Sequence, residues 1–308
     1  MKGLFVLVMK GRTQAIVATV VSAVLALMIT PLAVFSAAIV VLATLRNGAK
    51  EGLLVALSGA LAIAGIGGLM MNMPLAFGLF GLMLWVPAWL IASVLGSSHS
   101  LSKSLEAAAF AGLLVVGIQY LLLGNPGEFW GSILQQYMQG QFDPAVIPED
   151  QQQQVVAMIA GWMPGGVAAS WFISMALAVL LGRWGQALLE KPGAFGAEFR
   201  ELRFSKTWLI LVPVLLAISF FVYGGEPSLA GQFYLVGMAL FLLQGISVAH
   251  ALVNRLGRQT GWLFGLYFLL FVGAPHSVTA IAAAGYADGW LNFRAKVRGG
   301  SDQPPGPE

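Results

Sequence analysis

The side chains best suited to chemistry are polar groups that interrupt long apolar runs. Four of them recur on one stripe of a predicted helix, and a carboxylate follows in the closing run; they are Gln244, Ser247, His250, Asn254 and Asp288. Imidazole is the side chain that most readily exchanges protons near neutral pH. Polar groups in apolar helices face a protein interior or a water-filled cavity, because hydrocarbon offers no hydrogen bonds. The pattern predicts either hydrogen bonds between helices or a coupling path for protons or ions, with His250 as its first candidate.

Asp288 belongs to the closing stretch GYADGWLNFR, residues 285–294. A carboxylate near the end of an apolar helix is costly unless a cation pairs with it. Three arginines of the same predicted layer are candidate partners: Arg255, Arg258 and Arg294. The alternative is a helix-end anchor, in which Trp290 lies in the interfacial aromatic belt.

A second polar set lies at or just below the predicted outer ends of apolar segments, and it includes Asn125. Within one such segment, two tryptophans flank Pro87 at a spacing of one helical turn. They are either a ring-stacking wall of a binding pocket or packed and lipid-facing aromatics. The predicted substrate-binding residues are Asn72, Trp85, Trp89, Gln119, Tyr120 and His276.

Small residues recur every four positions in another apolar segment, at Ala56, Ala60, Ala64 and Gly68. Such a stripe lets a second helix approach closely. It predicts either packing inside the same bundle or a docking face for a partner membrane protein.

The composition excludes several classes of protein. The 308 residues are 58% hydrophobic and 9% charged, against about 25% charged in a soluble domain, so lipid is the expected solvent and partner. There is no Cys, and the three His residues lack metal-ligand spacing, so we expect no metal and no cofactor. No catalytic constellation is visible, and we expect no enzyme. The net charge of +3 comes from short basic clusters between apolar runs, so we expect no nucleic acid.

The apolar runs predict an all-α, polytopic bundle of transmembrane helices that forms one integral membrane domain, 1–308. Two stretches, 13–45 and 261–293, are each interrupted by a proline. If each is a pair of short helices, the chain crosses about ten times, and all 16 Lys and Arg fall on one side. If each is one tilted helix, six of these cations move to the other side. The charge distribution favours ten crossings in a bacterial inner membrane, with both termini cytoplasmic.

Three segments are predicted to lie outside the spans. The excursion 124–161 contains acids and glutamines but no Lys or Arg, which predicts an outer location with two interfacial amphipathic helices. The segment 184–206 is predicted to lie on the cytoplasmic interface. The tail 295–308 is predicted to be disordered.

Two resemblances follow from these motifs. The closing GYADGWLNFR pattern, with eight to ten spans and this length, resembles the YybS-like family of bacterial membrane proteins. The first third carries a proline-broken opening pair, the turn LRNGAKEG at 45–52 and a Gly- and Ala-rich third span. It is similar to the S components of energy-coupling-factor vitamin transporters. That resemblance implies a substrate-binding subunit of a larger transporter.

We therefore expect an integral membrane protein that binds or transports a small molecule. The alternative is a membrane scaffold or regulator that does not transport and acts through partner proteins.

Overall fold

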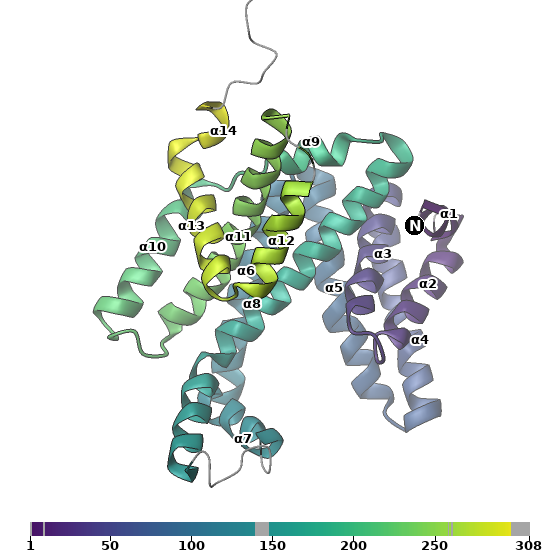
Figure 1. Ribbon diagram of the computed structural model, residues 1–308. Coiled ribbons are helices and arrows are strands. Elements are labelled where there is room, and N and C mark those ends of the chain that lie inside the picture. Colours follow the sequence, from purple (N-terminus) through teal and green to yellow (C-terminus); the bar gives the residue numbers. More distant parts are fainter. Residues whose placement is uncertain (1, 9, 139–147, 258, 260, 297–308) are drawn as a thin grey trace, which may run out of the picture. The chain divides into compact units, whose positions relative to one another are not determined.

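A computed structural model describes residues 2–8, 10–138, 148–257, 259 and 261–296. Throughout these residues the only regular secondary structure is helical, which confirms the all-α prediction (Figure 1). The helices, in order, are α1 Lys2–Val8, α2 Arg12–Leu25, α3 Pro31–Asn47, α4 Ala49–Met71, α5 Pro74–Ser98, α6 Leu101–Leu123, α7 Pro126–Met138, α8 Glu149–Glu190, α9 Ala194–Arg200, α10 Lys206–Phe221, α11 Leu229–Arg255, α12 Gly261–Val272, α13 His276–Leu291 and α14 Phe293–Lys296.

Five helices are long and apolar enough to cross a membrane: α4, α5, α6, α8 and α11, with 23 to 42 residues each. At 1.5 Å per residue, 23 residues extend about 34 Å, which exceeds the ~30 Å hydrocarbon core. Large apolar side chains on these and neighbouring helices stay exposed, including Leu69 at 91% and Phe271 at 86%. These features are consistent with a protein embedded in a membrane.

Each proline-broken stretch consists of two helices. The first forms α2 and α3, with a turn before Pro31, and the second forms α12 and α13, with a turn that contains Pro275. A single tilted helix is therefore excluded for both stretches. The halves are short, from 12 residues in α12 to 17 in α3, because proline lacks the N–H that would continue the helical ladder.

The excursion contains two helices, as predicted. Helix α7 occupies Pro126–Met138, and α8 begins at Glu149 with Glu149 and Asp150 in its first turn, where acids complement the helix dipole. Helix α8 continues past Pro164 and is 42 residues long in all, so its polar first turns and its apolar part form one element. Residues 139–147 lie outside the described part of the chain.

The segment 184–206 holds the end of α8 and the short helix α9. Its apolar side chains Phe199 and Leu202 are buried within the protein, at 9% and 1% exposure. Of the predicted disordered tail, residues 297–308 lie outside the described residues, and 295 and 296 belong to α14.

The chain divides into two compact units, a division that the sequence did not suggest. Unit 1 comprises 1–108 and 173–202, and unit 2 comprises 109–172 and 203–308. Two of the three boundaries fall inside α6 and α8, and the third lies between α9 and α10.

In unit 1, α4 packs along α5, and the small-residue stripe supplies the contact. Ala56 and Ala60 are buried. A Cβ on Gly81 of α5 would lie only 3.2 Å from the Ala60 Cα, and one on Gly78 would lie 3.2 Å from the Ala64 Cβ. At the end of the stripe, a Cβ on Gly68 would meet Pro74. The stripe is thus occupied by α5 of the same chain.

In unit 2, α11 is the central helix and packs against α10, α12, α13 and α14. Its closest approach is to α13. A Cβ on Gly245 would overlap the Ile281 carbonyl, and one on Gly285 would overlap the Phe241 carbonyl. Only glycine at these two positions allows the backbones to touch, and this contact fixes the position of α13 on α11.

Candidate functional site

A buried ion pair lies where α13 meets α14. The Asp288 carboxylate is fully buried, and Arg294 is 5% exposed. Arg294 donates from Nη2 at 2.7 Å and from Nε at 3.1 Å to Asp288 Oδ2. Asn292, in the left-handed conformation at φ 49°, ends α13 and lets the chain turn back so that the two side chains meet. Arg294, one of the three arginines that the sequence offered as partners, forms this pair; Arg258, another of the three, lies outside the described residues.

Two more arginines surround the pair. Arg203 Nη2 lies 3.7 Å from Asp288 Oδ2 and also donates to the Asn292 side-chain oxygen. Arg255, at the end of α11, donates to the Arg294 carbonyl oxygen. Arg294 Nη1 lies 3.4 Å from Ser247 Oγ. Three guanidinium groups and one carboxylate therefore gather at this end of unit 2, and positive charge is in excess.

Gln244 braces the helices next to this cluster. Its side chain is fully buried. It accepts a hydrogen bond from the Phe204 N–H at 3.0 Å and donates to the Gly285 carbonyl at 2.8 Å. The Gln244 amide thus links α11 both to the segment that precedes α10 and to α13. Both of its polar atoms form hydrogen bonds.

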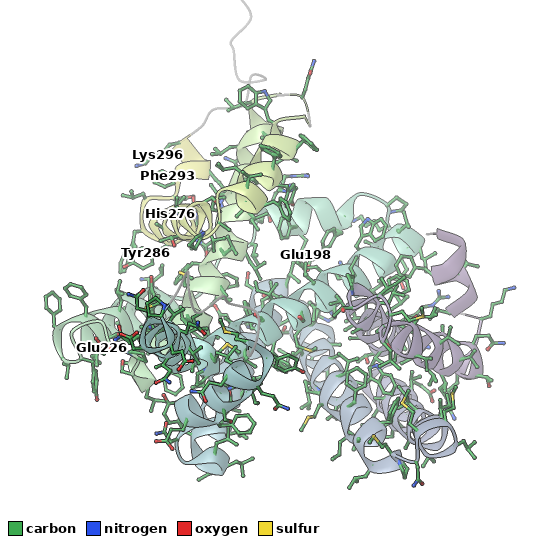
Figure 2. The ribbon with its side chains drawn as sticks, turned by 60° about the horizontal axis from the view of Figure 1, so that its bottom comes forward. Glu198, Glu226, His276, Tyr286, Phe293 and Lys296 are labelled. Carbon is green, nitrogen blue, oxygen red and sulfur yellow. The ribbon has the colours of Figure 1, made fainter. Side chains whose placement is uncertain are left out.

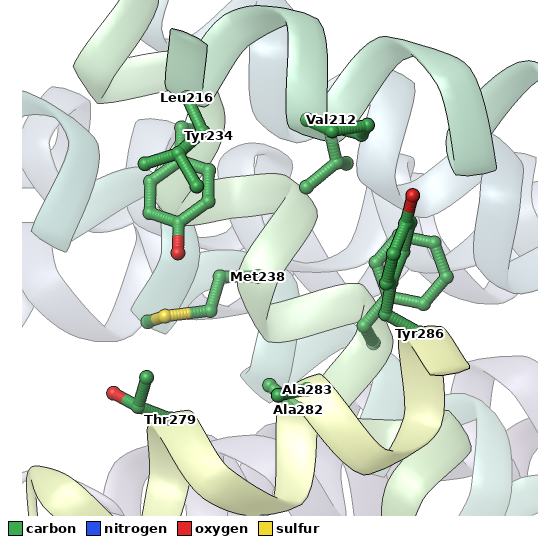
Figure 3. Close-up of a pocket in the computed structure, with 10 residues that line it drawn as sticks. Val212, Leu216, Tyr234, Met238, Thr279, Ala282, Ala283 and Tyr286 are labelled. Atoms are coloured by element: carbon green, nitrogen blue, oxygen red, sulfur yellow. The ribbon is translucent and has the colours of Figure 1, made fainter. Parts of the chain in front are cut away.

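Between α10, α11 and α13 lies an apolar cavity of about 160 Å³ (Figure 3). Its lining residues are Val212, Pro213, Leu216, Tyr234, Met238, Phe241, Thr279, Ala282, Ala283 and Tyr286. Tyr286 lies at one end in this view, Tyr234 and Thr279 lie at the other, and Met238 lies between Tyr234 and Thr279. The exposed side chains Thr279 and Ala283 belong to the lining, so the cavity reaches the surface of unit 2.

The cavity offers few polar groups. The Thr279 hydroxyl donates to the Pro275 carbonyl at 3.2 Å, and Tyr286 packs edge-on against Phe241 with ring centroids 5.3 Å apart. An apolar cavity of about 150 Å³ is large enough to hold a benzene-sized group. Its chemistry therefore suits an apolar ligand or the apolar part of an amphiphile.

The polar stripe of α11 does not converge on one point. Gln244 and Ser247 join the Asp288 cluster, whereas His250 Nε2 lies 2.9 Å from the Tyr267 hydroxyl of α12. Asn254 is exposed near the end of α11. The coupling role of these residues stays a prediction.

A second polar network of unit 2 surrounds Pro164 in α8. The Gly165 N–H donates to Gln232 Oε1, and Gln232 Nε2 donates to the Gly161 carbonyl, both at 2.7 Å. In a regular helix those two backbone groups pair with each other, so the Gln232 amide bridges them beside the proline.

Two predicted binding residues belong to this network. Gln119 donates to the Pro164 carbonyl at 3.1 Å and accepts from Trp130 Nε1 of α7 at 3.1 Å. The Tyr120 side chain lies beside Gln232. The network thus joins α6, α7, α8 and α11 within unit 2. Gln119 and Tyr120 both belong to it.

The other predicted binding residues lie apart from these clusters. In unit 1, Trp85 is fully buried and donates to Ser36 Oγ at 2.9 Å, and Trp89 donates to the Ala49 carbonyl at 2.7 Å. Asn72 is exposed and ends α4 in the left-handed conformation. His276 is exposed at the start of α13, ten residues before Tyr286 (Figure 2).

Sequence reasoning missed Arg203, Gln232 and the cavity residue Tyr234. An isolated amide in a long apolar run was a usable signal for Gln232, because such a group must find partners. Arg203 and Tyr234 carried no comparable signal, since arginine is common outside spans and tyrosine is common near their ends.

A polar hollow of about 300 Å³ lies in unit 1. Its lining includes His99, Arg183, Glu190, Lys191 and Glu198. Arg183 Nε donates to Glu198 Oε2 at 2.8 Å, so its charges largely offset each other. Among the described residues no cluster of His, Asp or Glu has the arrangement to hold a metal ion.

Comparison of the chain with protein families, with curated proteins and with solved structures found no match.

Proposed function

We propose that this chain is an integral protein of the bacterial inner membrane that binds or transports a small, largely apolar molecule. The observation that carries the proposal is the apolar cavity between α10, α11 and α13, which reaches the surface. Ligand sites in helical membrane proteins lie between helices in this way, with few polar groups to orient the ligand.

The proposed topology has ten crossings, made by α2 to α6, α8 and α10 to α13, with both termini cytoplasmic. The split of the two proline-broken stretches supports it, because two helices in each stretch, in place of one, keep all 16 Lys and Arg on one side. In this topology the Asp288 cluster faces the cytoplasm and α7 lies outside. The short helices α12 and α13, about 18 and 24 Å long, require a locally thin bilayer or partial crossing.

Coupling through His250 and Asp288, a lid formed by the outer helices, and assembly with an energy-coupling partner belong to the same proposal. The YybS-like and S-component resemblances motivate the last of these. Because α5 covers the Ala56–Ala60 part of the small-residue stripe, a partner would have to use another face.

A ligand screen with a cavity-filling variant tests the proposal. We expect some small apolar or amphipathic compounds to raise the unfolding temperature of the purified protein by several degrees, because a ligand that binds only the folded state stabilises it. Ala283→Phe, which fills the cavity from an exposed lining position, should abolish the shift.

The matched control is Ala284→Phe, at the next residue of α13, which is exposed but does not line the cavity. It should keep the shift. If no compound stabilises the wild-type protein, or if both variants respond equally, the cavity is not a ligand site, and the scaffold hypothesis becomes the better one.

A further inference from the structure

The cavity and the arginine cluster lie next to each other on the same helices of unit 2. From this we infer that together they form a site for one anionic phospholipid, with its phosphate at Arg203 and Arg255 and one acyl chain in the cavity. The inference rests on the proposed function and specifies its ligand class.

Charge favours an anionic head group. Arg203, Arg255 and Arg294 surround the single carboxylate of Asp288, and the exposed Lys206 follows at the start of α10. Asp288 is committed to Arg294 by two short hydrogen bonds. The Arg203 side chain is 40% exposed, and Arg255 is exposed as well, so an incoming phosphate can reach both. Arginine suits phosphate because its guanidinium binds two oxygens at once.

The spacing fits one lipid molecule. The end of the cavity nearest the cluster is formed by Val212, Phe241 and Tyr286. Val212 lies six residues from Lys206, about 9 Å along α10. Tyr286 lies two residues from Asp288, whose Oδ2 is 3.7 Å from Arg203 Nη2. Half of a bilayer's hydrocarbon core is about 15 Å thick. An acyl chain whose head group is bound at the arginines is therefore long enough to reach the cavity.

The cavity fits part of an acyl chain better than a whole small molecule. Its volume of about 160 Å³ is below the ~300 Å³ of typical sites for drug-sized ligands. Exposed apolar side chains continue from its mouth along α10, including Leu216, Phe220 and Phe221. The rest of the chain can therefore lie along this surface.

Photo-crosslinking to two matched lipids tests the inference. The full chain is placed in bilayers that contain phosphatidylglycerol or phosphatidylcholine, each with the same diazirine-bearing acyl chain, and labelled peptides are identified by mass spectrometry. We expect phosphatidylglycerol to label the α11 and α13 peptides about tenfold more than phosphatidylcholine, since each basic residue near the head group contributes a several-fold preference.

The variant Arg203→Gln/Arg255→Gln should bring this ratio close to one, whereas Arg203→Lys/Arg255→Lys should keep most of it. Arg46→Gln/Lys50→Gln, which removes two exposed cations of unit 1, should leave it unchanged. If the Gln variant fails to fold, the wild-type ratio at about 1 M salt replaces it, because the screening length there falls to about 3 Å and the ratio should collapse.

A wild-type ratio near one, with both lipids labelling these peptides, overturns the choice of an anionic head group and leaves the proposed ligand site intact. If neither lipid labels α11 or α13, the inference is also overturned, and the separate screen with Ala283→Phe then decides whether the cavity binds anything.

Discussion

The two units differ in the kind of polar group that they bury. The buried polar residues of unit 1 are all hydroxyls: Thr19, Ser36, Thr44 and Ser104. Among the described residues, the buried amides and charges all belong to unit 2: Gln232, Gln244, Asp288 and Arg294. Both units are helical and apolar. The kind of buried polar group is therefore what distinguishes unit 1 from unit 2, which contains the candidate site.

The physical reason lies in how many partners each group needs. A hydroxyl can donate to a carbonyl of its own helix, as Thr44 does to Val40 at 2.8 Å. An amide or a guanidinium has several donors, which one helix cannot satisfy. Gln244 therefore takes its partners from two other segments. A buried amide thus requires a particular arrangement of neighbouring helices, whereas a hydroxyl is compatible with many.

The largest expected effect comes from breaking the ion pair of unit 2. Asp288→Leu leaves Arg294 buried and unpaired, and we expect the free energy of unfolding to fall by about 3–5 kcal/mol. Chemical unfolding in detergent measures it. The double variant Asp288→Leu/Arg294→Met should recover most of the loss. If the single variant loses less than about 1 kcal/mol, the pair does not distinguish unit 2 from unit 1.

The hydrogen bond between Trp85 and Ser36 in the core of unit 1 should contribute less to the free energy of unfolding than the ion pair of unit 2. Trp85→Phe removes the hydrogen bond to Ser36 and leaves space in the core, and we expect a loss of about 2 kcal/mol. Trp89→Phe is the matched control, because it removes an equivalent N–H donor from a half-buried position, and its effect should be smaller. An equal loss of stability in both variants would mean that the indole hydrogen bond, and not core packing, accounts for the effect in unit 1.

The smallest effect is expected at the exposed ion pair of unit 1. Arg12 donates to Glu51 at 2.6 and 2.8 Å, yet Arg12→Gln should leave the unfolding temperature unchanged within error, because water screens exposed pairs. Arg294→Gln, measured in parallel, should lower it clearly. A comparable shift in the two variants would show that burial is not what separates the two ion pairs.

Much of the fold could be predicted from the length of the apolar runs and from the positions of the prolines that interrupt them. The long apolar runs, the helix pairs at Pro31 and Pro275, and the two helices of the excursion follow from local rules, because proline and apolar length act within a single segment. The two-unit division was not readable, since two of its three boundaries fall inside the continuous helices α6 and α8.

The candidate site was readable only in part. Asp288, Gln244 and Ser247 stood out as polar groups in apolar runs, and the need to neutralise Asp288 limited its partners to nearby arginines. His250 looked like part of the same group by spacing, yet it pairs with Tyr267, because position on one helix says nothing about which neighbour each side chain meets.

By itself, then, the sequence determined the apolar helices, their breaks and the requirement that each buried polar group find a partner, because these depend on the solvent and the local backbone. The tertiary structure alone decided that Arg294 completes the pair with Asp288, and that α10, α11 and α13 leave a cavity beside it. Both depend on contacts between segments that lie far apart in the chain, such as the Gly245–Gly285 backbone contact that fixes α13 on α11.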